Sequence, residues 1–173
     1  IMKKRQIKKL EAKSFNISLK KANILGVNVA IIDEIGVIKL LKKIITNRAY
    51  DKAFFVCTAN QEFVMQAQED EEFKRILNGA DLTIADGVGL RLVDSRLRTT
   101  PGRRIVHELA SLKGYRVFYL GGEKGVAGLM AKKYGGTYDP GSPDIKSQIT
   151  NPKLQTNSNS QIIRKINKYK PDI

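Results

Sequence analysis

One acidic side chain stands where a short apolar run gives way to a glycine. Asp86 follows the run Leu82–Ile84, with one alanine between them, and precedes Gly87. Such a run predicts a buried strand, so we expect the carboxylate at a sheet edge, where the glycine lets a ligand approach the backbone. A carboxylate in that position can take a proton from a sugar hydroxyl as a general base. The same pattern fits an N-cap for the helix after Gly87, and the local sequence alone favours that simpler interpretation.

Two polar side chains follow the apolar run at 53–57, which also predicts a buried strand. Thr58 and Asn60 offer short hydrogen-bonding groups in the loop expected at this second strand exit. Asn60 equally suits the cap of the helix predicted to follow it. Cys57, inside the run, is most simply a small residue of the core.

Groups suited to phosphate occur at two later turns. Arg103 and Arg104 follow Pro101-Gly102, and a guanidinium binds a diphosphate well, although a solvated arginine is the commoner case. Gly121-Gly122 precedes an expected helix start and resembles a phosphate-cradling turn. The chain has neither a G-x-G-x-x-G nor a Walker A sequence, so a plain strand-to-helix turn is the more common explanation.

The rare residue types exclude several kinds of site. His107 is the only histidine and Cys57 the only cysteine, which excludes an intramolecular disulfide, a cysteine cluster for zinc and any site that needs two histidines. The Asp-x-Asp metal motif of many nucleotide-sugar enzymes is also missing. We therefore predict no metal and no cofactor, and we interpret His107 as a surface or packing residue.

Strands and helices are expected to alternate along the chain. Apolar runs predict one or two short strands at 23–32, with Gly26 as the point of division, and strands at 53–57, 82–84 and 115–120. Helical spacing predicts helices at about 33–46, 61–78 with a break near 69–72, 88–96, 104–112, 124–133 and 160–169. This alternation indicates a single α/β domain with a Rossmann-like, mainly parallel sheet and helices on both faces. The strand exits at 58–60, 85–87 and 121–122 would then converge on one edge.

The charge is unevenly distributed. Lys and Arg number 31 against 17 Asp and Glu, and the net charge of +14 gathers in residues 1–21, 91–116 and 141–173. Basic segments of this kind suit a polyanion such as nucleic acid, an anionic membrane surface or a diphosphate. We interpret residues 1–21 as a basic N-terminal tail, with a merely solvated tail equally compatible. No apolar run reaches the length that spans a bilayer, and the basic start lacks the apolar core of a signal peptide, so we expect a cytoplasmic protein.

Two functional classes compete on composition. A basic nucleic-acid-binding module explains the charge, but it leaves the polar strand ends without a role, and aromatic residues for base stacking are few at 7%. A dinucleotide-dependent dehydrogenase is disfavoured because the glycine fingerprint is absent. We therefore predict no nucleic-acid partner.

Three stretches together resemble the WecG/TagA/CpsF family of bacterial glycosyltransferases. They are NILGVNVAIID at 23–33, FFVCTANQEFVMQAQEDEEFKRILNGADLTIADGVGL at 54–90 and RRIVHELASLKGYRVFYLGGEKGVA at 103–127. The middle stretch is the most specific, because it joins Thr-Ala-Asn to Ala-Asp-Gly-x-Gly at a set separation. The resemblance covers roughly residues 22–140, and KINKYKPDI at 165–173 matches weakly.

The resemblance implies a hexosyltransferase that needs no metal and inverts configuration. Its implied reaction moves N-acetylmannosamine from UDP-ManNAc to the 4-hydroxyl of undecaprenyl-diphospho-GlcNAc, in wall teichoic acid linkage-unit synthesis; another UDP-sugar transferase of the family is the alternative. By the same resemblance Asp86 is the catalytic base and Arg104 meets the diphosphate. The remaining predicted substrate-binding residues are Thr58, Asn60, Gly87 and Gly122.

The implied acceptor also suggests where the protein works. A lipid-linked acceptor implies a peripheral protein at the inner face of the cell membrane, with homo-oligomerisation left open. The family continues beyond Ile173 into a strand, a Gly-x-Pro-x-Gln-Glu motif and a basic C-terminal appendage, so we expect residues 22–173 to form the catalytic domain without them and to be less active. The family also usually has a Gly-x-Asp-Leu-like stretch where Ile105–Leu109 stands here, which leaves the loop geometry after Arg104 open.

Overall fold

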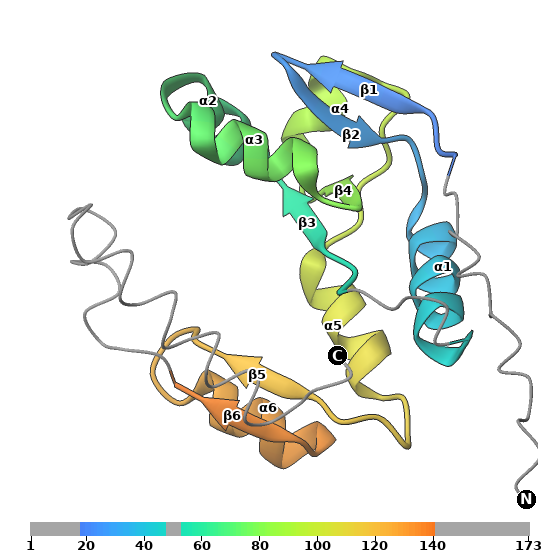
Figure 1. The fold of residues 1–173 in the computed structure, drawn as a ribbon, viewed down its shortest axis with the longest axis vertical. Helices are drawn as coiled ribbons and strands as arrows, with labels where there is room; N and C mark the ends of the chain where they lie inside the picture. The colour runs from blue at the N-terminus through green and yellow to red at the C-terminus, as the bar shows by residue number, and fades with distance from the viewer. Residues whose placement is uncertain (1–17, 48–52, 141–173) are drawn as a thin grey trace, which may run out of the picture. The chain divides into compact units, whose positions relative to one another are not determined.

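The computed structural model describes residues 18–47 and 53–140, which fall into two compact units divided between Ile105 and Val106 (Figure 1). The predicted α/β class is confirmed, because the described ranges interleave short strands with helices. Among the described strands, two pairs are parallel and one is antiparallel. The helix expected at 160–169 and most of the basic tail lie outside the described residues.

The first unit opens with a β-hairpin. Strands β1 (Lys21–Ile24) and β2 (Val27–Ala30) pair antiparallel around a turn in which Gly26 has a φ of 86°. Asn78, from a later helix, binds the hairpin through two hydrogen bonds. Its side chain donates to the carbonyl of Gly26 over 2.8 Å and accepts from the N–H of Asn28 over 2.9 Å. The turn is thus fixed by tertiary contacts as well as by its glycine.

Helix α1 (Glu34–Asn47) starts where the sequence predicts it. The N–H of Gly36 donates to the side chain of Asp33 over 2.7 Å, which satisfies one of the unpaired donors at the helix start. Val37 and Leu41 form part of its buried side.

The centre of the first unit is a parallel strand pair joined through two helices. Strand β3 (Val56–Ala59) leads to α2 (Gln61–Glu69) and α3 (Glu71–Gly79), and β4 (Leu82–Ala85) returns beside β3. The predicted break between the helices is confirmed: the Asp70 side chain accepts from the N–H of Phe73 over 2.9 Å and so starts α3. Figure 1 shows α2 and α3 side by side.

The loop predicted at 58–60 is partly wrong, because β3 runs on to Ala59. Its last residues are held in the ladder with β4, where Thr58 pairs with Ile84 and Ala59 with Ala85. The start of the predicted strand lies outside the ladder, and the N–H of Phe55 donates instead to the Asp81 side chain over 2.7 Å. Thr58 is therefore a strand residue.

The core of this unit collects apolar side chains from the hairpin, β3, β4 and the helices. Cys57 belongs to it, as predicted, and burial raises the pKa of its thiol. Phe63 and Phe73 meet edge to face, with ring centroids 5.4 Å apart. Leu77 is fully buried, and burying a side chain of this size contributes about 2 kcal/mol.

Two short helices follow β4, and the division between the units falls within the second. These are α4 (Gly89–Val93) and α5 (Gly102–Ala110). The second unit contains β5 (Phe118–Leu120), α6 (Val126–Tyr134) and β6 (Thr137–Asp139), a parallel pair joined by a helix. Strand β5 is shorter than predicted, and β6 was not expected.

Candidate functional site

Asp86 lies directly beyond β4, at the same level as the end of β3. Its backbone N–H donates to the carbonyl of Ala59 over 2.7 Å, and its partly buried carboxylate accepts from the N–H of Gly102 over 3.1 Å through Oδ2. The N-cap interpretation is wrong for the helix after Gly87: α4 begins at Gly89, and the N-cap residue Val88 makes no side-chain cap bond. The carboxylate instead caps the first residue of α5, a helix that arrives from further along the chain.

Thr58 and Asp86 face the same point at the start of α5. A Cβ added to Gly102 would lie 3.3 Å from Thr58 Oγ1 and 3.3 Å from Asp86 Oδ2. Most real Cβ contacts are looser than this, so glycine is suited to the place where a helix start approaches both side chains. The predicted convergence of these two strand ends is confirmed, while the catalytic and binding roles of their residues stay predictions.

Asn60 serves as the N-cap of α2. Its Oδ1 accepts from the N–H of Phe63 over 2.9 Å, so the simpler of its two sequence interpretations is confirmed. Its role in binding substrate stays a prediction.

Arg104 stands in the first turn of α5 and reaches to α1. Its Nε donates to Glu34 Oε1 over 3.1 Å, in a solvent-exposed ion pair. The side chain of neighbouring Arg103 has no ion pair or hydrogen bond within the described ranges. The guanidinium expected to meet a diphosphate is therefore already paired with a carboxylate.

The loop after Asp86 is hydrogen-bonded to Thr99 and Thr100, whereas no described residue fills the space beside Gly87. Thr99 donates its hydroxyl to the carbonyl of Gly87 over 3.1 Å, and the N–H of Thr100 donates to the carbonyl of Ala85 over 2.8 Å. Gly87 has a φ of 86°, and a Cβ built there would meet nothing within 4 Å. Thr100 is fully buried, and its Oγ1 has no hydrogen-bond partner in the described structure.

Gly122 belongs to the second unit, in the turn before α6. Gly121 and Gly122 both have positive φ, 75° and 87°, which agrees with a turn that favours glycine. The helix itself starts only at Val126, after Gly125, which has no side-chain cap bond to offer. The structure describes this turn within its own unit, and its proximity to Asp86 stays a prediction.

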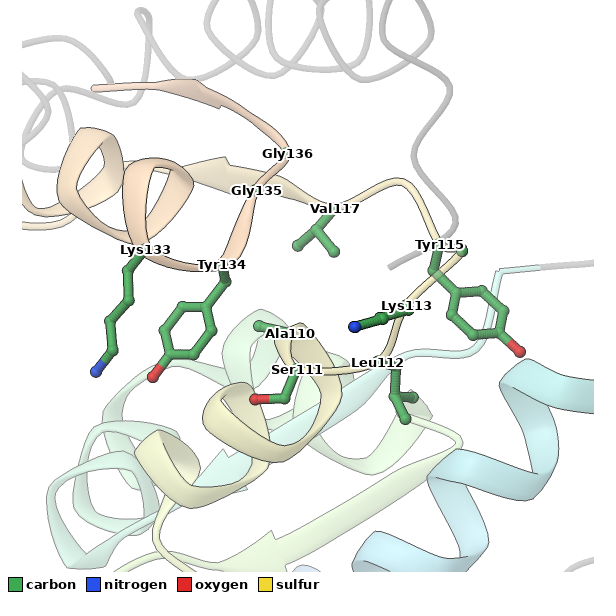
Figure 2. Close-up of a pocket in the computed structure, with 11 residues that line it drawn as sticks. Ala110, Ser111, Leu112, Lys113, Tyr115, Val117, Lys133, Tyr134, Gly135 and Gly136 are labelled. Carbon is green, nitrogen blue, oxygen red and sulfur yellow. The ribbon is translucent and has the colours of Figure 1, made fainter.

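The second unit also holds a pocket of about 380 Å³ (Figure 2). It lies between the end of α5, the segment leading to β5 and the end of α6, and its lining includes Lys113 and Lys133 but none of the predicted site residues. In Figure 2 the Tyr115 ring points away from Lys133 and Tyr134. His107 packs edge to face on Tyr134, with centroids 5.6 Å apart, as its packing interpretation predicts.

Two residues that contact the predicted site residues were not predicted from the sequence: Gly102, which binds Asp86, and Glu34, which binds Arg104. Gly102 was noted only as part of a turn, although a glycine after Pro101 at a helix start is a recognisable sign of close approach. Glu34 carries no local signal, because its partner Arg104 lies 70 positions away. Within the described ranges, no group of three or more His, Cys, Asp or Glu residues could hold a metal ion. No described helix is long and apolar enough to cross a bilayer.

Comparison with known proteins gives one clear match. The model of the family described as "Glycosyl transferase WecG/TagA/CpsF family" matches residues 22–173. A comparison with curated proteins finds no match. The matched region contains Thr58, Asp86 and Arg104, together with the glycines that surround them.

Proposed function

This chain belongs to the WecG/TagA/CpsF family of glycosyltransferases, and we propose that it transfers N-acetylmannosamine from UDP-ManNAc to the 4-hydroxyl of undecaprenyl-diphospho-GlcNAc. The family establishes the glycosyl transfer and supports a hexose as the group moved. The finer assignment, a teichoic acid N-acetylmannosaminyltransferase similar to TagA, is supported by the sequence of the middle stretch, from Thr58-Ala-Asn60 to Ala85-Asp86-Gly87. Another UDP-sugar of the same class is the alternative donor.

The observation that carries the proposal is the restrained carboxylate of Asp86. The N–H of Gly102 holds Oδ2, and Oδ1 remains to receive the proton of an acceptor hydroxyl. In a single displacement, the acceptor oxygen bonds to the anomeric carbon while the bond from that carbon to UDP breaks. The proton passes to Asp86 and the anomeric configuration inverts. The proposal also gives Thr58 a hydrogen bond to the reacting sugar, and its closeness to Asp86 at the start of α5 supports this role.

Arg104 is proposed to neutralise the charge that develops on the departing diphosphate. Because Arg104 is bound to Glu34, the diphosphate must either displace that carboxylate or share the guanidinium with it. A guanidinium has five N–H donors, and Glu34 is bound through Nε. The outer edge of the guanidinium is therefore available to an anion.

The proposed partners follow from the proposed acceptor. The protein would act as a peripheral protein at the cytoplasmic face of the membrane, without a nucleic-acid partner, and self-association is compatible with the proposal. A basic chain meets both an anionic surface and a diphosphate favourably.

The test is to replace Asp86 by asparagine and measure UDP release from UDP-ManNAc in the presence of a lipid-linked GlcNAc acceptor. Asparagine keeps an oxygen that can accept from Gly102, so folding should be preserved while the base is lost. Turnover should fall by roughly 10²–10⁴. Asp81→Asn, at the other end of β4, is the matched control and should retain turnover. Near-normal turnover of Asp86→Asn would remove Asp86 from the mechanism, and wild-type release from UDP-GlcNAc but not UDP-ManNAc would change the donor.

A further inference from the structure

Three large apolar side chains stand in solvent just after Asp86-Gly87. Val88 is 66% exposed, Leu92 84% and Val93 69%. With the neighbouring Arg91, these residues are called the α4 patch below. A single exposed apolar residue needs no explanation, but Val88 and Leu92 stand one helical turn apart, close in sequence to a candidate catalytic carboxylate, and together form a small apolar surface.

The patch is presented by a well-anchored helix. Leu90, within α4, and Leu97, four residues beyond its end, are both fully buried in the core of the first unit. The N–H of Leu92 donates to the carbonyl of Val88 over 3.2 Å, so these two side chains stand one turn apart. With about 100° per residue, Arg91 falls on the same side as Val88 and Leu92, and Leu90 falls opposite. Val93 lies about 100° around the helix from Leu92, so it borders this face and does not belong to it. The exposure is therefore a property of the folded unit.

The charges around the patch are only partly neutralised. Arg96 pairs with Asp94 over 2.7 Å, and that pair is close to neutral. Arg98 donates to the backbone carbonyls of Ser95 and Leu97, which leaves its charge uncompensated. Arg91 has no ion pair with any residue in the described ranges. Apolar side chains beside uncompensated guanidinium groups are the combination that binds an anionic bilayer surface.

We propose that the α4 patch docks on anionic lipid headgroups and presents Asp86 to an acceptor held in that bilayer. This inference rests on the proposed lipid-linked acceptor and adds the surface that meets the membrane. Val88 is two residues from Asp86, at most about 7 Å along the chain. Inserting the patch at headgroup level therefore brings the carboxylate to the depth of a lipid-borne diphosphate sugar. A second copy of the chain is the weaker occupant, because a two-fold contact would bring like-charged Arg91 groups together.

The test is sedimentation of the full chain with vesicles of phosphatidylcholine, with and without phosphatidylglycerol. Wild type should bind the anionic vesicles and lose binding at high salt. Leu92→Ser should weaken binding about tenfold. Arg91→Gln should weaken it about fivefold, the worth of one cation near an anionic surface. Met65→Ser is the matched control, because Met65 is a large apolar side chain, 59% exposed, on a helix of the same unit. It lies between Glu62 and Glu69, so the Met65→Ser variant should bind the vesicles as the wild type does.

Three outcomes would overturn the docking proposal. Leu92→Ser and Arg91→Gln could both bind as wild type does, which would place the contact elsewhere. Met65→Ser could lose as much as Leu92→Ser, which would make the contact unspecific. Leu92→Ser could dissolve an oligomer seen by analytical ultracentrifugation while vesicle binding stays unchanged, which would make the patch an interface between copies.

Activity measurements separate this proposal from the proposed function. With the acceptor embedded in vesicles, Leu92→Ser should slow transfer by more than it does with a water-soluble short-chain acceptor. Equal slowing with both acceptors would overturn the docking role. Absence of transfer by wild type to either acceptor would instead contradict the proposed function, and the vesicle experiment would still decide whether the patch docks.

Discussion

Removing Glu34 is predicted to tighten the binding of the sugar donor. The Arg104 guanidinium is bound to Glu34 Oε1 over 3.1 Å, and on the proposed mechanism the diphosphate of a UDP-sugar competes with this carboxylate for it. Glu34→Gln keeps the size of the side chain and removes its charge. The competing carboxylate is lost, so Arg104 becomes free for the diphosphate and the dissociation constant of UDP falls.

The size of the effect follows from the exposure of the pair. Both side chains are reached by solvent, and an exposed ion pair contributes about 0.2–1 kcal/mol. Glu34→Gln should therefore lower the dissociation constant of UDP by about 1.5- to 5-fold. Arg104→Gln should raise it by roughly 10- to 100-fold, since hydrogen bonds to charged groups contribute about 1.5–3 kcal/mol. Arg103→Gln, one position away and unpaired in the described structure, is the matched control and should change it little.

Titration calorimetry with UDP measures these constants without interference from the chemical step, and KM for UDP-ManNAc follows separately. The decisive comparison is a double-mutant cycle between Glu34 and Arg104. If the two residues compete as described, Glu34→Gln tightens binding in the wild type more than in the Arg104→Gln background. Equal tightening in both backgrounds would mean that Glu34 acts only by long-range repulsion, and the reasoning about Arg104 would be refuted.

Three further predictions concern stability and reactivity. Thr100→Val should raise the free energy of unfolding by about 1 kcal/mol in urea denaturation, because it replaces a buried hydroxyl without a partner by a methyl group; a loss of stability would reveal an unseen partner for Oγ1. Cys57 should resist a thiol reagent at pH 8 until the protein unfolds, because burial raises its pKa and covers its sulfur; rapid labelling of the native protein would contradict its place in the core. The hydrogen bond from the Arg96 side chain lowers the pKa of the Asp94 carboxyl from 3.8 to about 2, so Asp94 stabilises the fold above its unfolded pKa and loses this contribution as the pH falls toward 2. Asp94→Asn should therefore unfold at lower urea than wild type at pH 7, with the difference shrinking between about pH 4 and pH 2; a difference independent of pH would exclude the ion pair as its cause.

Local pattern predicted that the helices and strands around the site exist, but not all of their ends: α5 begins at Gly102, two residues before its predicted start. The break between α2 and α3 was predictable because Asp70 is a strong helix start, and the cap of Asn60 was one of two interpretations stated for it. The end of β3 was not predictable, because it depends on how far the partner strand β4 extends. Strand β6 lacks a long apolar run and is formed by pairing with β5.

The composition of the candidate site was predictable only where strands define it. Thr58 and Asp86 both follow apolar runs, and parallel pairing brings their strand ends together. The helix that Asp86 caps was assigned wrongly, because an acidic residue before a glycine suggests a local cap, whereas its actual donor is Gly102. The partner of Arg104 could not be predicted for the same reason. Tertiary folding brings Glu34 to Arg104, and no spacing in the sequence indicates this contact.

Two selective constraints act on position 86: one comes from the hydrogen bond to Gly102, and the other from the proposed chemistry. Abundance in the cell depends on an acceptor for the first N–H of α5, a need that Asn or Ser at position 86 can meet and that Ala or Leu cannot. Sugar transfer, on the proposed mechanism, also requires a base there. A mutational scan at position 86 scored for protein level should tolerate several short polar residues, whereas one scored for product should accept little besides Asp. Homologues that have lost activity would be expected to drift first within the short polar group, and an Asn at this position would then mark a chain that keeps its fold after losing its chemistry.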